Sequence, residues 1–519
     1  MPKIEIKNTC IIIHNYTPGD SPSIERFFSV WDKLTHRAYP KAIKYNEETK
    51  ELFLPRGIDI GWVEAAMQSD AEINTDCDLV SEIRPIMLKF LPRDDTQKEA
   101  IKFLLGEGRY SYTTGKSQLM CNLNPGEGKT YLSIVMAAVI GMRTIMITSA
   151  RGWIEQWKDR ILQYTDTAPN EIGFIIGSVS ISRILNGNTN TNNIKFFLCS
   201  HGTLKSYGDK YGWDKIGLLF QKLGIGLKIY DEAHIDFDNI CAIDFATNTY
   251  KTLYLTATPA RSDVEENKIY QTAFKNVPSI DLFDDDKDPR TEYVALFFNS
   301  HPTAFDINRC KNAYGFDILK YIDYVVKRPN FYKLLYVLVA IAKKRGKTLI
   351  YIGKNDCIDT VYQWMNYWFP ELRGNIGIYN STIQDKDIKA DQLNKYIILS
   401  TIKSCGAAID IADLKLTIVL ANPFKSKVIA RQSLGRTRDK DTMYIEVVDK
   451  GFAVLKGYYK SKQGVFAKYA TKCTDINLMD ADLEFQYEKL YAKSQEYYNQ
   501  FSKNQNLIHI VDRVKRRDI

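Results

Sequence analysis

Short apolar runs alternate with longer amphipathic stretches along most of the chain, beginning near residue 91. A short apolar run is typical of a strand that is buried on both faces, and each stretch between two runs is long enough for a crossover helix. This alternation predicts a parallel sheet with helices on both faces. The strands of this first series are expected at Thr144–Thr148, Phe174–Ile176, Lys195–Cys199, Leu227–Tyr230 and Thr252–Leu255.

A second series of the same kind follows an acidic loop at Asp284–Pro289, which we interpret as a solvated linker. The repetition predicts two α/β domains, the first at residues 91–290 and the second at residues 291–470. The strands of the second series are expected at Thr348–Ile352, Asn375–Tyr379, Tyr396–Ser400, Leu416–Leu420 and Met443–Val448.

The two ends of the chain depart from this pattern. Residues 1–90 predict a small α+β unit with a strand at Lys3–Ile13, a helix at Ile24–Leu34 and a hairpin at Ala42–Leu54. Residues 471–519 are polar and aromatic, and they predict a mostly helical extension. The extension ends in a basic cluster that either contacts phosphates or is only solvated, formed by Arg513, Lys515, Arg516 and Arg517.

Composition narrows the class of protein. Over 519 residues, 45% are hydrophobic and 25% are charged, which excludes a disordered or fibrous chain. The formal net charge of +8 permits a polyanionic partner without requiring one. The nine cysteines include no CxxC pair, which argues against a zinc ribbon or a disulfide framework and favours a reducing compartment. The most apolar stretch, Tyr131–Ala150, is interrupted by Gly141 and Arg143, so no membrane span is predicted.

The N-terminal residues contain no apolar segment of the kind found in secretory signals. We therefore expect a cytoplasmic protein, located in the host cytoplasm if the source is a phage or a virus.

The strongest local motif is GEGKT at residues 126–130, which precedes a helical pattern that begins at Tyr131. Glycines allow the backbone to wrap a phosphate, Lys129 can reach the β- and γ-phosphates, and the Thr130 hydroxyl can bind Mg²⁺. The helix N-terminus adds a partial positive charge. Leu123 occupies the first glycine position of a complete Walker sequence, so the alternative interpretation is a glycine-rich turn without function.

A second motif follows the predicted strand Leu227–Tyr230, which runs directly into Asp231, Glu232, Ala233 and His234. A carboxylate at the C-terminal end of such a strand is where nucleotide-binding α/β folds place a Mg²⁺ ligand, here Asp231. Glu232 can orient or deprotonate an attacking water. The alternative is an acidic pair that only caps a helix.

Further segments follow in order and include TATP at residues 256–259, GAAID at residues 406–410 and QSLGRTR at residues 432–438. Upstream lie Gln97, a Gln-Trp pair that ends at Trp157, and SHGTL at residues 200–204. In order and spacing, the set resembles the DEAH-box helicases and translocases of superfamily 2. The segment that ends at Arg261 resembles the XPB-like group. The core is similar to poxvirus transcript-release helicases, and the N-terminal unit is similar to the accessory domain of UvsW-type phage helicases.

This resemblance implies two tandem RecA-like, doubly wound parallel-sheet domains, a small N-terminal α+β accessory domain and a helical C-terminal tail, with ATP and Mg²⁺ as cofactors. It assigns catalysis to Lys129, Asp231, Glu232, Gln432, Arg436 and Arg438. Nucleotide binding is assigned to Gln97, Gly126, Glu127, Gly128, Lys129, Thr130, Gly406 and Asp410, and metal binding to Thr130 and Asp231. Nucleic-acid contact or coupling is assigned to Thr203, His234, Thr256, Thr258, Arg261 and Thr401.

The last motif departs from the family pattern. In QxxGRxxR the second arginine stands three residues after the first, but Asp439 occupies that position here, and Arg438 precedes it. Arg436 matches the pattern, and whether Arg438 takes the second role stays open.

Three functions agree with these features. The first is an ATP-dependent helicase or translocase acting on duplex, forked or junction DNA in phage or viral replication, recombination or repair, as a monomeric motor with replication or recombination proteins as possible partners. The second is a transcription-linked ATPase that releases or remodels RNA. The third is a virion-associated P-loop ATPase that does not unwind nucleic acid. We expect DNA rather than RNA as the partner, because the N-terminal unit is similar to the accessory domain of UvsW-type helicases. No membrane partner is expected.

The N-terminal unit itself has two interpretations. Its basic residues Arg37, Lys41, Lys44 and Arg56 are interleaved with aromatic residues, among them Tyr39, Tyr45 and Phe53. If these side chains are exposed, they can hold phosphates and stack on bases, and the unit recognises DNA. The alternative is a small domain that only braces the first α/β domain.

Overall fold

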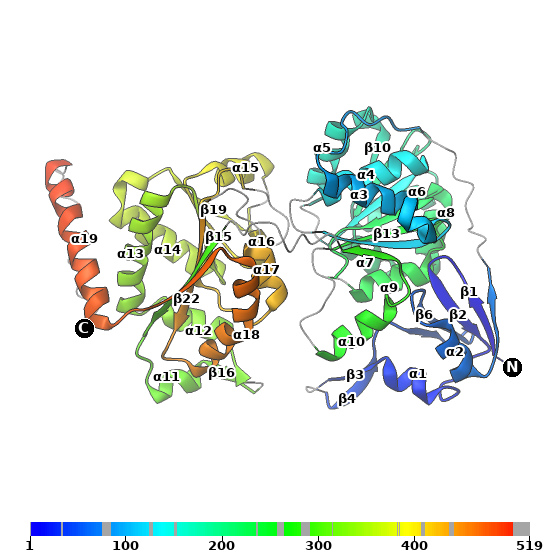
Figure 1. Ribbon diagram of the computed structural model, residues 1–519, viewed down its shortest axis with the longest axis horizontal. Coiled ribbons are helices and arrows are strands. Elements are labelled where there is room, and N and C mark those ends of the chain that lie inside the picture. Colours follow the sequence, from blue (N-terminus) through cyan, green and yellow to red (C-terminus); the bar gives the residue numbers. More distant parts are fainter. Residues whose placement is uncertain are drawn as a thin grey trace. The chain divides into compact units, whose positions relative to one another are not determined.

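The protein divides into two compact units, Met1–Asp285 and Asp286–Ile519 (Figure 1). The computed structural model describes residues 2–32, 35–74, 85–123, 128–149, 153–234, 237–256, 264–281, 291–313, 315–380, 382–383, 385–405, 411–434 and 441–501.

The first unit is built on a seven-stranded sheet in which each neighbouring pair of strands is parallel. The five predicted strands are confirmed, with ends shifted by up to two residues. Two more strands, β8 and β14, complete the sheet on the side of β13. In spatial order the strands are β10 (Ile172–Ile175), β11 (Phe196–Ser200), β9 (Thr144–Thr148), β12 (Leu227–Tyr230), β13 (Lys251–Thr256), β8 (Gln118–Asn122) and β14 (Ser279–Asp281).

Helices cover both faces of this sheet, because successive strand residues point to opposite sides and both sides are apolar. Met146 of β9 faces a core with helices of one layer, whereas Ile145 and Ile147 face the other layer. The first layer contains α3 (Asp95–Leu105), α4 (Lys129–Ile140) and α5 (Ile154–Tyr164). The second contains α6 (Gly177–Leu185), α7 (His201–Tyr211), α8 (Trp213–Leu223) and α9 (Phe237–Ala246).

The N-terminal residues form a separate five-stranded sheet. The predicted hairpin is confirmed, but the predicted strand at 3–13 is two antiparallel strands, because the chain turns where the Lys7 amide donates to the Cys10 carbonyl. The predicted helix at 24–34 ends early, and its second half is a strand. The elements are β5 (Lys44–Asn46), β6 (Glu51–Pro55), β2 (Cys10–His14), β1 (Lys3–Ile6) and β7 (Ala71–Ile73) in the sheet, with α1 (Pro22–Phe27), α2 (Ile60–Met67) and the hairpin β3 (Ser29–Asp32)–β4 (Arg37–Pro40) beside it.

This N-terminal sheet shares a hydrophobic core with α9 and α10 (Val264–Ala273) of the same unit. Ile11 and Leu54 are fully buried there, and Phe237 and Tyr270 lie in the same cluster at 1% exposure each. A sheet that buries one face against its neighbour is part of that neighbour's core rather than an independent domain. The packing therefore favours the bracing interpretation.

The expected exposure of the basic and aromatic residues in this unit is wrong for most of them. Lys41 is 9% exposed, and its ammonium group contacts Asp238 at 2.6 Å and Glu266 at 2.9 Å. Lys44, Tyr45, Phe53 and Arg56 are half-buried. The apolar parts of these side chains cover apolar surface, as such side chains often do. Arg37 and Tyr39, on the hairpin β3–β4, are exposed as expected.

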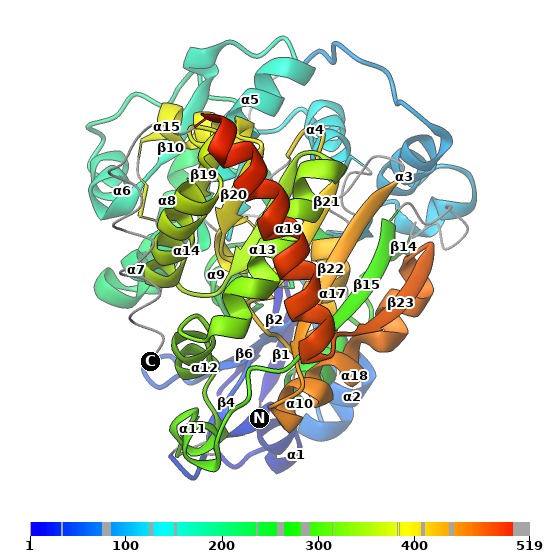
Figure 2. The same ribbon diagram turned by 90° about the vertical axis from the view of Figure 1, so that its left-hand side faces the viewer.

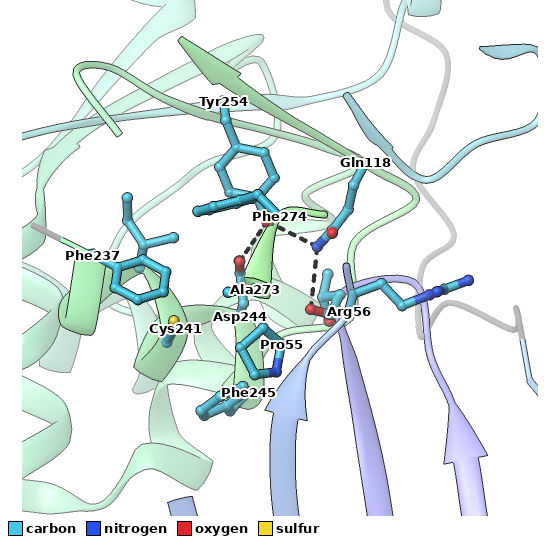
Figure 3. Close-up of a pocket in the computed structure, with 12 residues that line it drawn as sticks. Pro55, Arg56, Gln118, Phe237, Cys241, Asp244, Phe245, Tyr254, Ala273 and Phe274 are labelled. Atoms are coloured by element: carbon cyan, nitrogen blue, oxygen red, sulfur yellow. Dashed lines mark hydrogen bonds between the residues drawn. The ribbon is translucent and has the colours of Figure 1, made fainter. Parts of the chain in front are cut away.

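A buried polar network joins the N-terminal sheet to the parallel sheet (Figure 3). The Tyr254 hydroxyl donates to Asp244 at 2.7 Å, and the Gln118 amide nitrogen contacts both the Tyr254 hydroxyl (2.8 Å) and the Thr9 carbonyl (3.2 Å). Asp244 also holds the fully buried Lys228 ammonium group at 2.5 Å. Beside the network lies a cavity of about 10 Å³, which is room for a single water molecule.

The second unit repeats the parallel sheet with seven strands. All five predicted strands are confirmed, and β15 and β23 lie beyond them on the side of β22. In spatial order the strands are β19 (Ile376–Tyr379), β20 (Ile397–Ser400), β18 (Thr348–Ile352), β21 (Leu416–Ala421), β22 (Thr442–Asp449), β15 (Thr291–Phe298) and β23 (Lys472–Asn477).

Strand β23 lies in the C-terminal extension, where a mostly helical segment was expected. Most of its side chains are exposed, so its sequence lacks the apolar alternation that predicts a strand, and backbone pairing to β15 holds it in place. The expected helix follows as α19 (Asp480–Phe501). The basic cluster Arg513, Lys515, Arg516 and Arg517 lies outside the described residues.

Two helical layers cover the second sheet as well (Figure 2). Helix α19 lies along α13, and the Tyr336 hydroxyl of α13 donates to the Leu490 carbonyl. One layer contains α12 (Ile318–Val325), α13 (Pro329–Arg345), α14 (Asn355–Trp368) and α19, and the other contains α17 (Lys427–Leu434) and α18 (Ala453–Tyr469). The remaining elements are α11 (Ala304–Arg309), α15 (Lys386–Asn394), α16 (Ile402–Cys405) and the two-stranded β16 (Lys311–Asn312)–β17 (Gly315–Phe316). Within the described ranges, no helix is long and apolar enough to cross a membrane.

Candidate nucleotide site

Gly128 sets the start of the first predicted site element, helix α4. It is the N-cap residue with a φ of 94°, a left-handed conformation that glycine adopts without strain. A Cβ atom at this position would lie 2.3 Å from the amide nitrogen of Gln97. The backbone angle therefore favours glycine, and any larger residue would also displace the end of the Gln97 side chain. Gly126 and Glu127 lie outside the described residues.

Gln97, which the resemblance assigns to nucleotide binding, lies at this helix end. Its side chain is 4% exposed, and its Oε1 atom accepts a hydrogen bond from the Arg93 amide at 2.9 Å. The Gln97 backbone amide donates to the N-cap carboxylate of Asp94 at 2.9 Å, which starts helix α3. The first bond orients the Gln97 side chain so that its Nε2 atom faces Gly128, and the second fixes the backbone of Gln97.

Lys129 and Glu232 come together across the two motifs. The Lys129 ammonium group lies 3.1 Å from Glu232 Oε1, and the two side chains are 11% and 9% exposed. Glu232 has a φ of 52°, which turns the chain sharply after β12. Because the pair is shielded from water, its charges interact more strongly than a surface pair would.

Asp231 lies beside this pair at the C-terminal end of β12. Its Oδ2 atom accepts a hydrogen bond from the Trp157 indole at 3.0 Å, and its backbone amide donates to the Ile147 carbonyl. Burial, and then the charge of Glu232, raise the pKa of the Asp231 carboxyl to about 6, while Lys129 and Trp157 oppose the increase. Two buried carboxylates beside a single lysine leave an excess of negative charge. A further cation at this position would stabilise both carboxylates in their ionised form.

The donor atoms here fit Mg²⁺. Thr130 follows Lys129 in the first turn of α4 and supplies a hydroxyl oxygen, and Asp231 supplies a carboxylate oxygen. Mg²⁺ in nucleotide sites is held by one or two such oxygen ligands together with phosphates and water. Among the described residues no cluster of three or more His, Cys, Asp or Glu side chains could hold a metal by itself.

His234 links the acidic motif to the end of β13. Its Nδ1 atom lies 2.9 Å from the Thr256 hydroxyl and 3.4 Å from Glu232 Oε2, and both His234 and Thr256 are buried. The Ala233 amide donates to the Leu255 carbonyl at 2.8 Å. The predicted coupling residues His234 and Thr256 therefore contact each other directly.

Two other predicted nucleic-acid residues lie at helix starts. Thr203 is half-buried in the first turn of α7, and its amide donates to the N-cap hydroxyl of Ser200. In the second unit, the Thr401 hydroxyl accepts the Ser404 amide at 3.0 Å just after β20. Both contacts stabilise the start of the adjoining helix.

Several predicted site residues cannot be placed. Gln432 lies in α17, but its side chain is not described. The others lie outside the described residues, and they are Thr258, Arg261, Gly406, Asp410, Arg436 and Arg438.

The sequence did not predict the contact between Trp157 and Asp231. The Gln-Trp pair was noted as part of the family pattern, but no role was assigned to its indole. The amphipathic spacing of Ile154, Trp157 and Ile161 on α5 predicts only that the ring is buried.

The segment that holds most of these residues matches a known family. A model of the family described as "Type III restriction enzyme, res subunit" covers residues 91–261. The protein "Putative DNA 3'-5' helicase Rad25" of Haloarcula marismortui is 27% identical over 146 residues, which are 28% of this chain and 21% of the relative. The protein of the same name from Halobacterium salinarum is 26% identical over the same length and shares of the two chains. The match thus spans about a fifth of these relatives.

Solved structures are also similar to this chain. The DNA-bound type ISP restriction-modification enzyme LlaBIII is similar with a TM-score of 0.51 at 14% identity, covering 79% of this chain and 32% of that one. Phage T4 UvsW is similar with a TM-score of 0.36 at 13% identity, over 92% of this chain and 100% of that one. The likeness to LlaBIII agrees with two RecA-like α/β domains. Residues 91–261 thus match the family model, and the two parallel sheets agree with a tandem RecA-like α/β fold.

Proposed function

We propose that this protein is an ATP-dependent DNA helicase or translocase that acts on duplex or branched DNA. The observation that carries the proposal is the buried group formed by Lys129, Asp231 and Glu232, with one cation and two carboxylates at the start of a helix. The choice of DNA is supported by the relatives named as DNA helicases. An XPB-like assignment and a phage or viral source stay predictions.

In this proposal, each residue has a defined task. Lys129 exchanges its contact with Glu232 for the β- and γ-phosphates of ATP, aided by the positive end of α4. The released Glu232 carboxylate orients the attacking water and accepts its proton. Thr130 and Asp231 would hold Mg²⁺, which supplies neutralisation of phosphate charge when bound. His234 and Thr256 then connect a change at Glu232 to the end of β13.

The experiment that tests the function compares ATPase rates of the full chain without nucleic acid and with single-stranded DNA, duplex, fork, Holliday junction and RNA. We expect stimulation by DNA, with strong dependence on salt because the contacts are to phosphates. Stimulation by RNA alone would replace the proposal with a transcript-releasing ATPase. A rate indifferent to every nucleic acid would support an ATPase that does not unwind.

Arg436→Ala should lower turnover more than it weakens ATP binding, because the arginine acts on charge that develops in the transition state. Loss of one charge-assisted contact worth about 3 kcal/mol corresponds to roughly 10²-fold in kcat. Arg438→Ala is the matched variant. An equal loss would show that Arg438 replaces the arginine missing at Asp439, and a mild loss would show that one arginine suffices. If both variants hydrolyse ATP normally, the proposed role of residues 432–438 is wrong.

The exposed hairpin β3–β4 is the remaining candidate for DNA recognition in the N-terminal unit. Trp31 is 53% exposed and Tyr39 is 41% exposed, and Arg37 is exposed beside them. Stacking on a base is worth about 1–3 kcal/mol per aromatic residue. The triple change Trp31→Ala, Arg37→Ala and Tyr39→Ala should therefore weaken DNA binding by ~10-fold or more in a fluorescence anisotropy titration.

Neither basal ATPase nor melting temperature should change much in this triple variant, because these side chains are exposed and lie outside the core. Tyr250→Ala is the control, since Tyr250 is 45% exposed but precedes β13 at the opposite end of the strand from Thr256. DNA affinity equal to that of the wild type in the triple variant would leave the N-terminal unit with the bracing role alone.

A further inference from the structure

The side chain of Trp157 reaches the carboxylate that the proposed function assigns to the metal. Its ring is 3% exposed and lies between α5 and the parallel sheet, in the same apolar cluster as Ile154 and Ile161. Its only polar atom, the indole nitrogen, donates to Asp231 Oδ2 at 3.0 Å. A rigid, buried ring with one donor holds its acceptor in one place.

The indole also orients the carboxylate of Asp231. Oδ2 is engaged by Trp157, and the backbone of Asp231 is fixed by the bond from its amide to the Ile147 carbonyl at 3.0 Å. The Glu232 backbone amide also donates a hydrogen bond to this carboxylate. The carboxylate is therefore oriented by two donors, and its two oxygens have further lone pairs for a cation.

Apolar packing alone does not account for the hydrogen bond from Trp157 to Asp231. Apolar packing around α5 needs no donor, and a phenylalanine ring, although smaller, would also be buried there without one. A buried indole nitrogen needs a partner, and here the partner is one of the two carboxylates at the predicted metal site.

From this geometry we infer that Trp157 is a positioning residue that presents Asp231 to the Mg²⁺ of Mg²⁺·nucleotide. The inference rests on the proposed function, because it assumes that Asp231 binds the metal. Partners of metal ligands that act in this way change metal affinity by about 10–100-fold when they are removed.

The test uses Trp157→Phe, which keeps a buried ring and removes the N–H group. Binding of Mn²⁺ in the presence of saturating ADP is measured by electron paramagnetic resonance, and binding of ADP in EDTA is measured separately. We expect the Mn²⁺ dissociation constant to rise by about 10–100-fold with metal-free ADP binding unchanged. In steady state, the Mg²⁺ concentration for half-maximal ATPase should rise by a similar factor, while kcat at saturating Mg²⁺ recovers most of its value.

Two controls separate positioning from folding. Trp213→Phe removes an indole from α8, on the other helical layer of the sheet, and should leave Mn²⁺ affinity unchanged. Replacing Trp157 by 3-benzothienylalanine keeps the shape of the indole and replaces only its N–H group by sulfur. It should reproduce the loss seen in Trp157→Phe.

The outcomes distinguish this inference from the proposed function. Unchanged Mn²⁺ affinity in a folded Trp157→Phe protein would overturn the inference and leave the ATPase proposal intact. An equal loss of metal-free ADP binding would also overturn it, since the ring would then shape the whole pocket. If the wild-type protein itself binds neither Mn²⁺·ADP nor ATP, the proposed function fails first.

Discussion

Lys129→Ala is expected to abolish ATP turnover while leaving the protein folded. The variant removes the cation that lies 3.1 Å from Glu232 and that the proposal directs to the transferred phosphate. Loss of a positive group that neutralises charge on the γ-phosphate costs about 10³- to 10⁵-fold in rate. Lys129 also opposes the increase in the pKa of Asp231, so without it this carboxyl is protonated more readily at neutral pH. Steady-state ATPase with and without DNA measures the effect.

Lys195→Ala provides a matched control for this variant. Lys195 forms an ion pair of the same length, 3.1 Å, with Glu171 in the same unit, and its side chain is 14% exposed. Losing that pair should leave kcat within about a few-fold of the wild-type value, because the pair lies outside the site. Near-normal ATPase in a folded Lys129→Ala protein would remove the assignment of residues 126–130 to phosphate binding.

Glu232→Gln is expected to bind ATP and nucleic acid normally and to hydrolyse ATP about 10³- to 10⁴-fold more slowly. The amide keeps the size of the side chain and its contact distance to Lys129, but it cannot take a proton from water. The change also removes the charge that raises the pKa of Asp231, so Asp231 stays ionised and able to bind a metal at neutral pH. Single-turnover hydrolysis and equilibrium binding of ATP separate the two effects.

Glu171→Gln is the corresponding control, because it neutralises the carboxylate of the Lys195 pair outside the site. It should hydrolyse ATP at the wild-type rate. If Glu232→Gln turns over freely, the catalytic carboxylate lies elsewhere in the chain.

The sheets were largely predictable because their strands are buried on both faces. Runs such as Leu227–Tyr230 are apolar enough to stand out from the amphipathic helices around them. Four strands of these sheets were not predicted, and two of them, β8 and β15, are buried runs that the sequence could have revealed. The other two lack that signal. β14 has three residues, and β23 exposes most of its side chains, so both are defined by the strands they pair with rather than by their own sequence. Pairing between distant segments is not visible in local periodicity.

The candidate site likewise has residues that a local sequence pattern predicts and contacts that no such pattern predicts. Lys129, Asp231 and Glu232 were predicted from motifs whose spacing carries their chemistry, and the structure brings Lys129 and Glu232 into contact. The bond from Trp157 to Asp231 joins residues 74 positions apart, and no local pattern encodes it. The burial of Lys41 was missed for the same reason, since its partners Asp238 and Glu266 lie on helices far along the chain.

The core that the N-terminal strands share with α9 and α10 also sets an order of events while the chain is being made. Ile11 and Leu54 leave the ribosome well before Phe237 and Tyr270, and at about 5–20 residues per second the delay is about 10–50 s. During that interval the apolar face of a nascent sheet has no partner to cover it. The yield of folded enzyme therefore depends on how well the cell shields this face, and faster or slower translation should change the yield without any change in the stability of the finished protein.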